Sequence, residues 1–190
     1  MDNSVIIILI HQTVFQGMFF AKNFSLRRKL GIPIRGKNRE ATMSIIFFSI
    51  FIVVSLLLGL IDTTFGTFHL LTNTSAMIVS IILLVINVPV GMASLIGLKD
   101  SWRVGVPEDQ QTSLIETGIY AFSRNPYFLA YLIMFTAYTI LLQNIILLVL
   151  SIIGFIMIHL MVLKEEKYLT ALHGEKYNQY RKKVARYFII

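Results

Sequence analysis

Residues 117–128 read TGIYAFSRNPYF, and this stretch opens the apolar hairpin that decides the fold. Two apolar runs follow it, at 127–142 and 145–163, and only Gln143-Asn144 separates them. A connection of two residues between helices permits only a tight antiparallel turn. The second run ends at Lys164-Glu165-Glu166-Lys167. We therefore expect the two polar patches that bracket the hairpin to meet at one membrane surface.

The composition is that of a membrane protein. Of the 190 residues, 56% are hydrophobic and only 14% are charged, whereas soluble domains carry about 25% charged residues. Several spans of about 20 residues each would use more than half of the chain, which leaves no room for a separate soluble catalytic domain. We therefore treat residues 1–190 as a single membrane-embedded domain, with a three-helix part at 1–97 and a cofactor-binding catalytic part at 98–190.

Five apolar segments have the length of membrane-spanning helices. They cover about 5–21, 43–61, 76–97, 127–142 and 145–163. At about 1.5 Å per residue they reach from about 24 to 33 Å, against a hydrocarbon core of about 30 Å. Backbone polar groups must be satisfied internally in lipid, and these runs lack the alternation of barrel strands. We predict an all-α, polytopic membrane protein with five transmembrane helices, of which the last two form a hairpin.

The basic residues fall on one face of this arrangement. Seven Lys and Arg residues lie between the first and second helices, three between the third and fourth, and seven after the fifth. The N-terminal tail, the 62–75 loop and the 143–144 turn contain none. By the positive-inside rule the basic face is cytoplasmic, so the N-terminus is predicted outside and the C-terminus in the cytoplasm. A polar cytoplasmic helix over about 163–184 is expected to follow the hairpin.

Polar residues also occur inside the first apolar segment. Gln12 and Gln16 share a helix face, and His11 lies beside them. Polar side chains in membrane helices often hydrogen-bond to neighbouring helices. We expect these three residues to serve packing between helices.

Three short motifs stand in order around the hairpin. They are Gly118-Ile119-Tyr120 with Arg124-Asn125-Pro126-Tyr127, then Glu165-Glu166, then Gly174-Glu175-Lys176-Tyr177-Asn178-Gln179-Tyr180. Over roughly 102–186 this order resembles the isoprenylcysteine carboxyl methyltransferase and phospholipid methyltransferase superfamily of integral membrane enzymes. That family builds its S-adenosylmethionine pocket from a Gly-x-Tyr-x-x-x-Arg-His-Pro-x-Tyr block, a Glu-Glu pair and a Gly-Glu-x-Tyr-x-x-Tyr run. The chain departs from this pattern at Asn125, where the family usually has His.

The resemblance implies which residues contact the cofactor. We favour Glu165 over Glu166, because Glu165 lies nine residues before Gly174, at the offset of the family's cofactor-binding glutamate. Glu166 and Arg103 are then candidates for catalysis: Glu166 to help remove a proton, and Arg103 to replace the substrate-binding arginine of the family, whose position holds Met161 here. The cofactor-binding residues implied are Ser113, Leu114, Ile115, Tyr120, Asn125, Pro126, Tyr127, Phe128 and Glu165.

The chemistry of methyl transfer agrees with these residue types. Displacement at a sulfonium needs mainly alignment of donor and acceptor and exclusion of water. S-adenosylmethionine presents an ammonium for a carboxylate, a carboxylate for N–H donors and a positive sulfur that aromatic faces stabilise. The simpler alternative is a helix start at the interface, with Asn125 as its cap, Pro126 in the first turn and Tyr127 in an aromatic belt.

We expect methyl transfer from S-adenosylmethionine to a lipid or prenylated acceptor from the bilayer, with S-adenosylhomocysteine as the product. Through the 101–103 stretch, Ser-Trp-Arg, and the Gly-Ile-Tyr spacing, the resemblance leans toward the carboxyl methyltransferases of the isoprenylcysteine type. A phospholipid amine N-methyltransferase is the alternative, and an NADPH-dependent sterol-type reductase shares the polytopic plan. A transporter or scaffold would instead gather polar residues at mid-membrane.

Absent motifs exclude other classes of function. The chain has no cysteine, and its four histidines are not spaced as metal ligands, so we expect no metal. The net charge of +7 is explained by topology and by attraction to anionic lipids. No nucleic-acid recognition motif occurs, so we expect no nucleic-acid partner.

Overall fold

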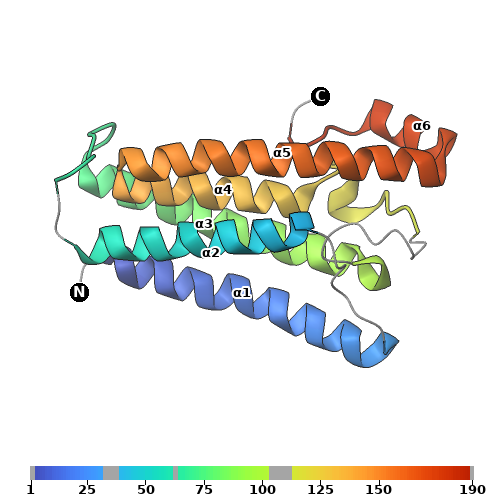
Figure 1. Ribbon diagram of the computed structural model, residues 1–190, viewed down its shortest axis with the longest axis horizontal. Helices are drawn as coiled ribbons and strands as arrows, with labels where there is room; N and C mark the ends of the chain where they lie inside the picture. The colour runs from blue at the N-terminus through green and yellow to red at the C-terminus, as the bar shows by residue number, and fades with distance from the viewer. Residues whose placement is uncertain (1–2, 32–38, 62–63, 103–112, 189–190) are drawn as a thin grey trace.

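The computed structural model describes residues 3–31, 39–61, 64–102 and 113–188. Within these ranges the chain is almost entirely helical, and strand-like pairing is confined to two isolated bridges. Figure 1 shows the long helices running side by side, with α6 at the end where α5 finishes. The elements are α1 (Asn3–Leu30), α2 (Arg39–Leu60), α3 (Asn73–Gly97), η1 (Lys99–Ser101), η2 (Gly118–Ala121), α4 (Pro126–Leu142), α5 (Ile145–His173) and α6 (Glu175–Lys183), where η marks a 3-10 helix.

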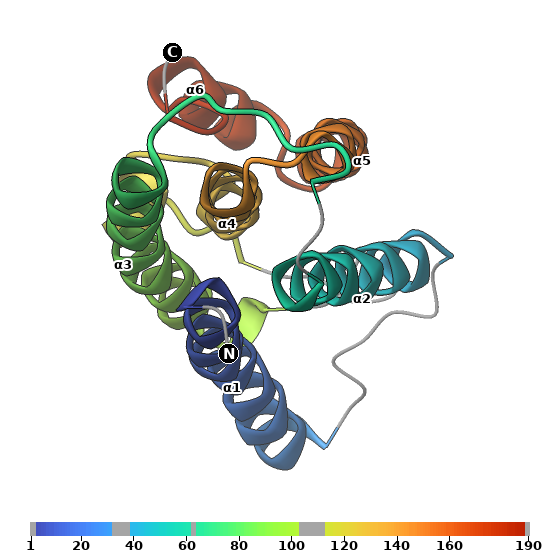
Figure 2. The ribbon, with the colours of Figure 1, turned by 90° about the vertical axis from the view of Figure 1, so that its left-hand side faces the viewer.

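The predicted all-α polytopic membrane fold is confirmed. Helices α1, α2, α3 and α5 are long and apolar enough to cross a membrane, and α4 is a shorter apolar helix. The long helices expose large hydrophobic side chains such as Ile10, Val85 and Leu160, as a surface in lipid requires. Helix α4 contacts all four of them, and the end-on view in Figure 2 shows it among them. Its side chains are therefore covered mostly by protein.

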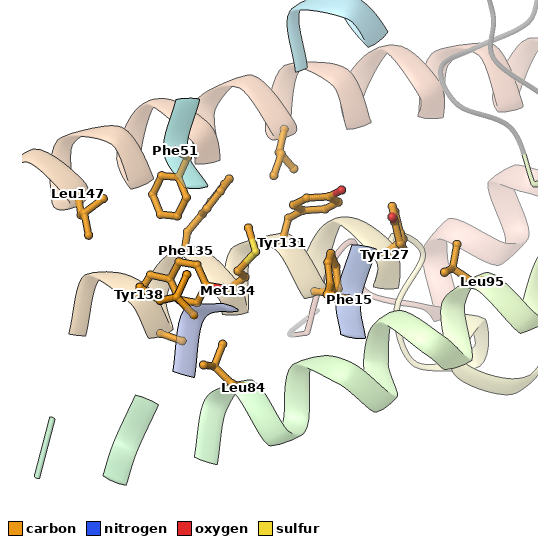
Figure 3. Close-up of a cluster of buried hydrophobic side chains, with 14 of the residues drawn as sticks. Phe15, Phe51, Leu84, Leu95, Tyr127, Tyr131, Met134, Phe135, Tyr138 and Leu147 are labelled. Atoms are coloured by element: carbon orange, nitrogen blue, oxygen red, sulfur yellow. The ribbon is translucent and has the colours of Figure 1, made fainter. Parts of the chain in front are cut away.

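Aromatic side chains from α4 form the centre of the core (Figure 3). Phe135 packs on Phe51 of α2, with 4.6 Å between ring centroids, and Tyr131 stacks on Phe48 of α2 at 4.3 Å. Phe15 of α1 meets Tyr131 edge-on at 5.4 Å. Because lipid offers no hydrophobic driving force between helices, this close packing is a main source of cohesion in the bundle.

A polar network joins α1, α3 and α4 inside the bundle. The imidazole of His11 lies 2.8 Å from the Tyr138 hydroxyl and 2.9 Å from Oδ1 of Asn87. Nε2 of Gln12 donates to the Tyr138 hydroxyl at 2.8 Å, and Nε2 of Gln16 donates to Gln12 at 3.2 Å. The predicted role of His11 and Gln12 in joining helices is confirmed, whereas Gln16 bonds within α1.

The hairpin of α4 and α5 is also confirmed. Gln143 adopts a left-handed conformation, with φ 41°, and the Asn144 side chain accepts from the backbone of Ile146 at 2.9 Å. The α2–α3 connection covers this turn, because Oε1 of Gln143 accepts from the backbone N–H groups of Leu70 and Leu71, each at 2.8 Å. The two connections predicted to lack basic residues therefore lie at the same end of the bundle.

The opposite end carries the basic last turn of α1, Lys99 after α3 and the basic last turn of α6. Lys29 pairs with Asp100 at 2.6 Å, and Nε1 of Trp102 donates to Asn23 at 2.8 Å, so the end of α1 is tied to the end of α3. Helix α5 has 29 residues and is about 43 Å long, so its last turns extend beyond a hydrocarbon core of about 30 Å.

The C-terminal helix differs from the prediction of one polar helix over about 163–184. Helix α5 continues from the membrane segment to His173, and a break at Gly174 separates it from α6. Gly174 has φ +54° and ψ −127°, a conformation that side-chain-bearing residues rarely adopt. The break allows α6 to turn back toward η2 and Arg124, where the Tyr180 hydroxyl donates to the carbonyl of Tyr120 and Nη1 of Arg124 donates to the carbonyl of Arg181.

Candidate functional site

The site lies where α3 ends, α4 begins and α5 continues toward α6, at the right-hand end of Figure 1. Pro126 is the first residue of α4, where its fixed φ and missing N–H are favourable. The backbone just before it pairs with the end of the chain, because the Arg124 N–H donates to the carbonyl of Ala185 at 2.9 Å. The first motif is thereby joined to the segment that follows the third motif.

The side chain of Asn125 does not cap α4. Its Nδ2 instead donates to Oε1 of Glu166 at 3.4 Å and to the carbonyl of Arg186 at 3.2 Å. Both partners are acceptors, which fixes the orientation of the amide. The helix-cap alternative therefore fails for this side chain, which links α4 to α5 and to the end of the chain.

Glu166 is the centre of an ion-pair cluster that we call the Glu166 cluster: Arg124, Asn125, Glu166 and Arg186. The Glu166 side chain is 9% exposed. Its Oε1 lies 2.9 Å from Nη2 of Arg124, and its Oε2 lies 3.0 Å from Nη2 of Arg186. Two guanidinium groups thus compensate a buried carboxylate, as an interior charge requires.

The pKa values of three side chains in and around the cluster are raised, so these groups keep their protons at neutral pH. The hydrogen bond to Glu166 raises the pKa of Arg186, so its guanidinium stays charged. Burial, and after it the charge of Glu166, raises the pKa of Tyr177. Burial also raises the pKa of Tyr180, whose hydroxyl donates to the carbonyl of Tyr120 at 2.6 Å. The two tyrosines of the third motif are therefore neutral, and Tyr180 joins α6 to η2.

Tyr120 and Glu165 lie near each other on the other side of the cluster. Burial, and after it the charge of Glu165, raises the pKa of Tyr120. The Tyr120 ring lies against Gly97, where an added Cβ would approach it to 3.1 Å. Glu165 is half-buried and forms no hydrogen bond or ion pair within the described part of the chain. Burial, and after it the charge of Glu166, raises the pKa of Glu165 to about 7. A cationic ligand would favour its ionised form.

Tyr127 belongs to an aromatic group at the start of α4. Its ring packs edge-on against Trp102 at 4.7 Å and near Phe19 at 6.4 Å. Trp102 is 5% and Tyr127 8% exposed. These side chains are therefore buried in the bundle. An interfacial aromatic belt would instead place them at the lipid headgroups. The Tyr127 hydroxyl is buried and has no hydrogen-bond partner among the described residues.

The other residues predicted for the site are placed as follows. Ser113 is exposed, with its hydroxyl 3.1 Å from that of Ser101, and Leu114 and Ile115 are half-buried. Phe128 packs partly buried against the core. Arg103 lies outside the described residues. Within those residues, no group of three or more His, Asp or Glu side chains is arranged to hold a metal ion.

Met161 occupies the position where the sequence comparison expected a substrate-binding arginine. Its sulfur accepts from the hydroxyl of Ser44 on α2 at 3.0 Å. Met161 therefore contributes to the contact between α2 and α5.

Sequence reasoning missed Arg186 as a member of the site. The signal was present, because Arg186 is the one charge in the apolar ending VARYFII, residues 184–190. A lone charge among apolar residues near a membrane surface calls for a partner. Arg124 belongs to the first motif, but its pairing with Glu166 was not predicted.

Comparison with known proteins agrees with this geometry. A family model described as phospholipid methyltransferase matches residues 75–176, which is more than half of the chain. The match runs from α3 through α5 and includes the first motif, the glutamate pair and the start of the third motif. No curated protein matches the chain.

Proposed function

The chain belongs to the phospholipid methyltransferase family of integral membrane enzymes, and from this we propose that it uses S-adenosylmethionine to methylate a lipophilic acceptor. The observation that carries the proposal is the half-buried Glu165, which has no hydrogen bond or ion pair among the described residues and lies near Tyr120 and next to Glu166. The site stands where a water-soluble donor and a bilayer-borne acceptor can both arrive. It has the groups that a sulfonium donor needs.

Each cofactor-side residue has a proposed role. Glu165 takes the ammonium of S-adenosylmethionine, and Tyr120 and the backbone of residues 113–115 line the adenosine side. Asn125 offers its Oδ1 as an acceptor, because its two N–H groups are held by Glu166 and Arg186. Pro126, Tyr127 and Phe128 complete the pocket wall, and the Tyr127 ring with its neighbours stabilises the positive sulfur.

We propose a changed role for Glu166. Two guanidinium groups keep its carboxylate ionised and occupied, which is unsuitable for accepting a proton. Glu166 instead shapes the site by holding Asn125, Arg124 and the end of the chain. Arg103 keeps its proposed role in binding the acceptor.

For the acceptor we propose a carboxylate of the isoprenylcysteine type. A carboxylate is already a nucleophile at neutral pH, so the reaction needs no general base. This agrees with a site in which Glu166 is engaged by arginines. The second candidate is a phospholipid amine, which the description of the family names. An amine must lose a proton, and Glu165 would then have to take it.

We propose that the site faces the cytoplasm and that the N-terminus lies outside. The end of the bundle that carries the site also carries Arg27, Arg28 and Lys29 of α1 and the basic last turn of α6. Basic residues accumulate on the cytoplasmic side of membrane proteins. S-adenosylmethionine would then enter from the cytoplasm.

Calorimetry in detergent micelles tests the cofactor. We expect S-adenosylhomocysteine to bind and NADPH not to bind, and the reverse result would favour a reductase. Methyl-labelled S-adenosylmethionine then tests the acceptor, in separate vesicles that contain a prenylcysteine or phosphatidylethanolamine. A methyl ester releases its label as methanol in alkali, whereas an N-methyl group retains it. Label retained on the phospholipid alone would replace the carboxylate proposal by the amine.

A further inference from the structure

The C-terminal segment, residues 184–188, returns from α6 to the start of α4 and to α5, and Figure 1 shows it running back along α5. Ala185 forms a parallel bridge with Ser123. The carbonyl of Arg186 accepts from the Ser123 hydroxyl at 3.3 Å and from Nδ2 of Asn125 at 3.2 Å. Farther along, the Tyr187 hydroxyl lies 3.4 Å from Nδ1 of His159 on α5. The segment thus contacts both helices that form the site.

The side chain of Arg186 binds Glu166 through two nitrogens. Nε donates to Oε1 at 3.1 Å and Nη2 donates to Oε2 at 3.0 Å. Arg124 reaches only Oε1, with Nε at 3.2 Å and Nη2 at 2.9 Å. Within the described residues, Oε2 of Glu166 therefore depends on Arg186 alone. A bidentate guanidinium fixes the rotation of a carboxylate as well as its charge.

The backbone and the side chain of Arg186 act on the same neighbour. Nδ2 of Asn125 is held by the Arg186 carbonyl and by Oε1 of Glu166, which Arg186 itself orients. Asn125 is 8% exposed, so its amide has little freedom to find water instead. The direction of the Asn125 amide, and with it the Oδ1 offered to a ligand, is set by Arg186.

We propose that Arg186 is a positioning residue for the cofactor site, acting through Glu166 and Asn125 from the end of the chain. This inference rests on the proposed function, because it assigns Arg186 a place in the binding of S-adenosylmethionine. Arg186 itself need not touch the cofactor. Its role is to hold the start of α4 against α5, so that the Asn125 amide keeps a fixed orientation.

The test measures S-adenosylhomocysteine affinity by calorimetry on purified, full-length protein in micelles. Arg186→Met removes the guanidinium, and we expect the affinity to fall more than about tenfold, as for loss of a buried charge-assisted contact. Arg186→Lys keeps the charge but cannot span both carboxylate oxygens, and we expect a fall of about three- to tenfold. The matched control is Lys183→Met, an exposed basic residue at the end of α6, which should leave the affinity unchanged.

A double-mutant cycle separates positioning from simple loss of stability. In a Glu166→Gln background, Arg186→Met should change the affinity less than about twofold, because the carboxylate through which it acts is gone. The KM for S-adenosylmethionine should rise in Arg186→Lys while kcat changes less than about threefold.

Two results would overturn the assignment. A lower melting temperature with S-adenosylhomocysteine affinity within about twofold of wild type in both Arg186 variants would make Arg186 a stability residue only. Equal effects of Arg186→Met with and without Glu166 would show that it does not act through that carboxylate. Failure of the wild-type protein to bind S-adenosylhomocysteine would overturn the proposed function itself, and this result is distinct from the other two.

Discussion

Replacing Glu166 with alanine removes the carboxylate that two guanidinium groups share. The Arg124 side chain is 9% exposed and that of Arg186 is 34% exposed. Removing one partner of a fully buried ion pair costs about 3–5 kcal/mol, because the remaining charge is left uncompensated. Water can reach Arg186 in part, so we expect the free energy of unfolding to fall by about 2–3 kcal/mol. For a chain of this size that corresponds to a melting temperature about 4–12 °C lower.

The assay follows thermal unfolding in detergent micelles by circular dichroism and by fluorescence. Trp102 is the only tryptophan and packs against Tyr127, so its emission reports on the site. The matched control is Lys29→Met, which breaks an ion pair whose side chains are 63% and 52% exposed. Exposed pairs contribute about 0–1 kcal/mol, so this change should have little effect. Equal melting temperatures for Glu166→Ala and Lys29→Met would refute the view that the cluster holds this end of the bundle.

Three further outcomes are expected. Glu165→Ala should weaken S-adenosylhomocysteine binding more than about tenfold, because it removes the carboxylate proposed for the cofactor's ammonium. Calorimetry checks this, with Lys167→Ala as the control. An unchanged affinity would show that Glu165 does not belong to the pocket. Asn125→His should retain binding and Asn125→Leu should lose it, since leucine removes the one amide that donates to both Oε1 of Glu166 and the Arg186 carbonyl and so links α4 to α5 and the C-terminal segment. Equal affinities for the two variants would contradict this. Reporter fusions at residue 68 and at the C-terminus should lie on opposite sides of the membrane, and finding both on one side would break the five-crossing topology.

Several features of the site were predictable because the signals are local. Apolar run length and charge distribution predicted the helices and the gathering of basic residues at one end of the bundle. The two-residue connection Gln143-Asn144 predicted the hairpin. Because the polar patches bracket this hairpin, they were predicted to meet at one surface, and the Asn125–Glu166 contact confirms that they lie together.

The sequence by itself determined the spans and the end of the bundle that carries the polar groups, because hydropathy, helix rise and turn length act over neighbouring residues. Only the tertiary structure decided which charges pair and which stay free. Arg186 meets Glu166 because Gly174 breaks the helix and turns α6 back, a long-range consequence of one backbone conformation. The same folding engages Glu166 and leaves Glu165 unpaired within the described residues, although the two carboxylates are adjacent and chemically identical in the sequence. Adjacent residues of a helix point in different directions, so Glu165 and Glu166 face different surroundings. Only Glu166 faces the start of α4 and the C-terminal segment, which supply its partners.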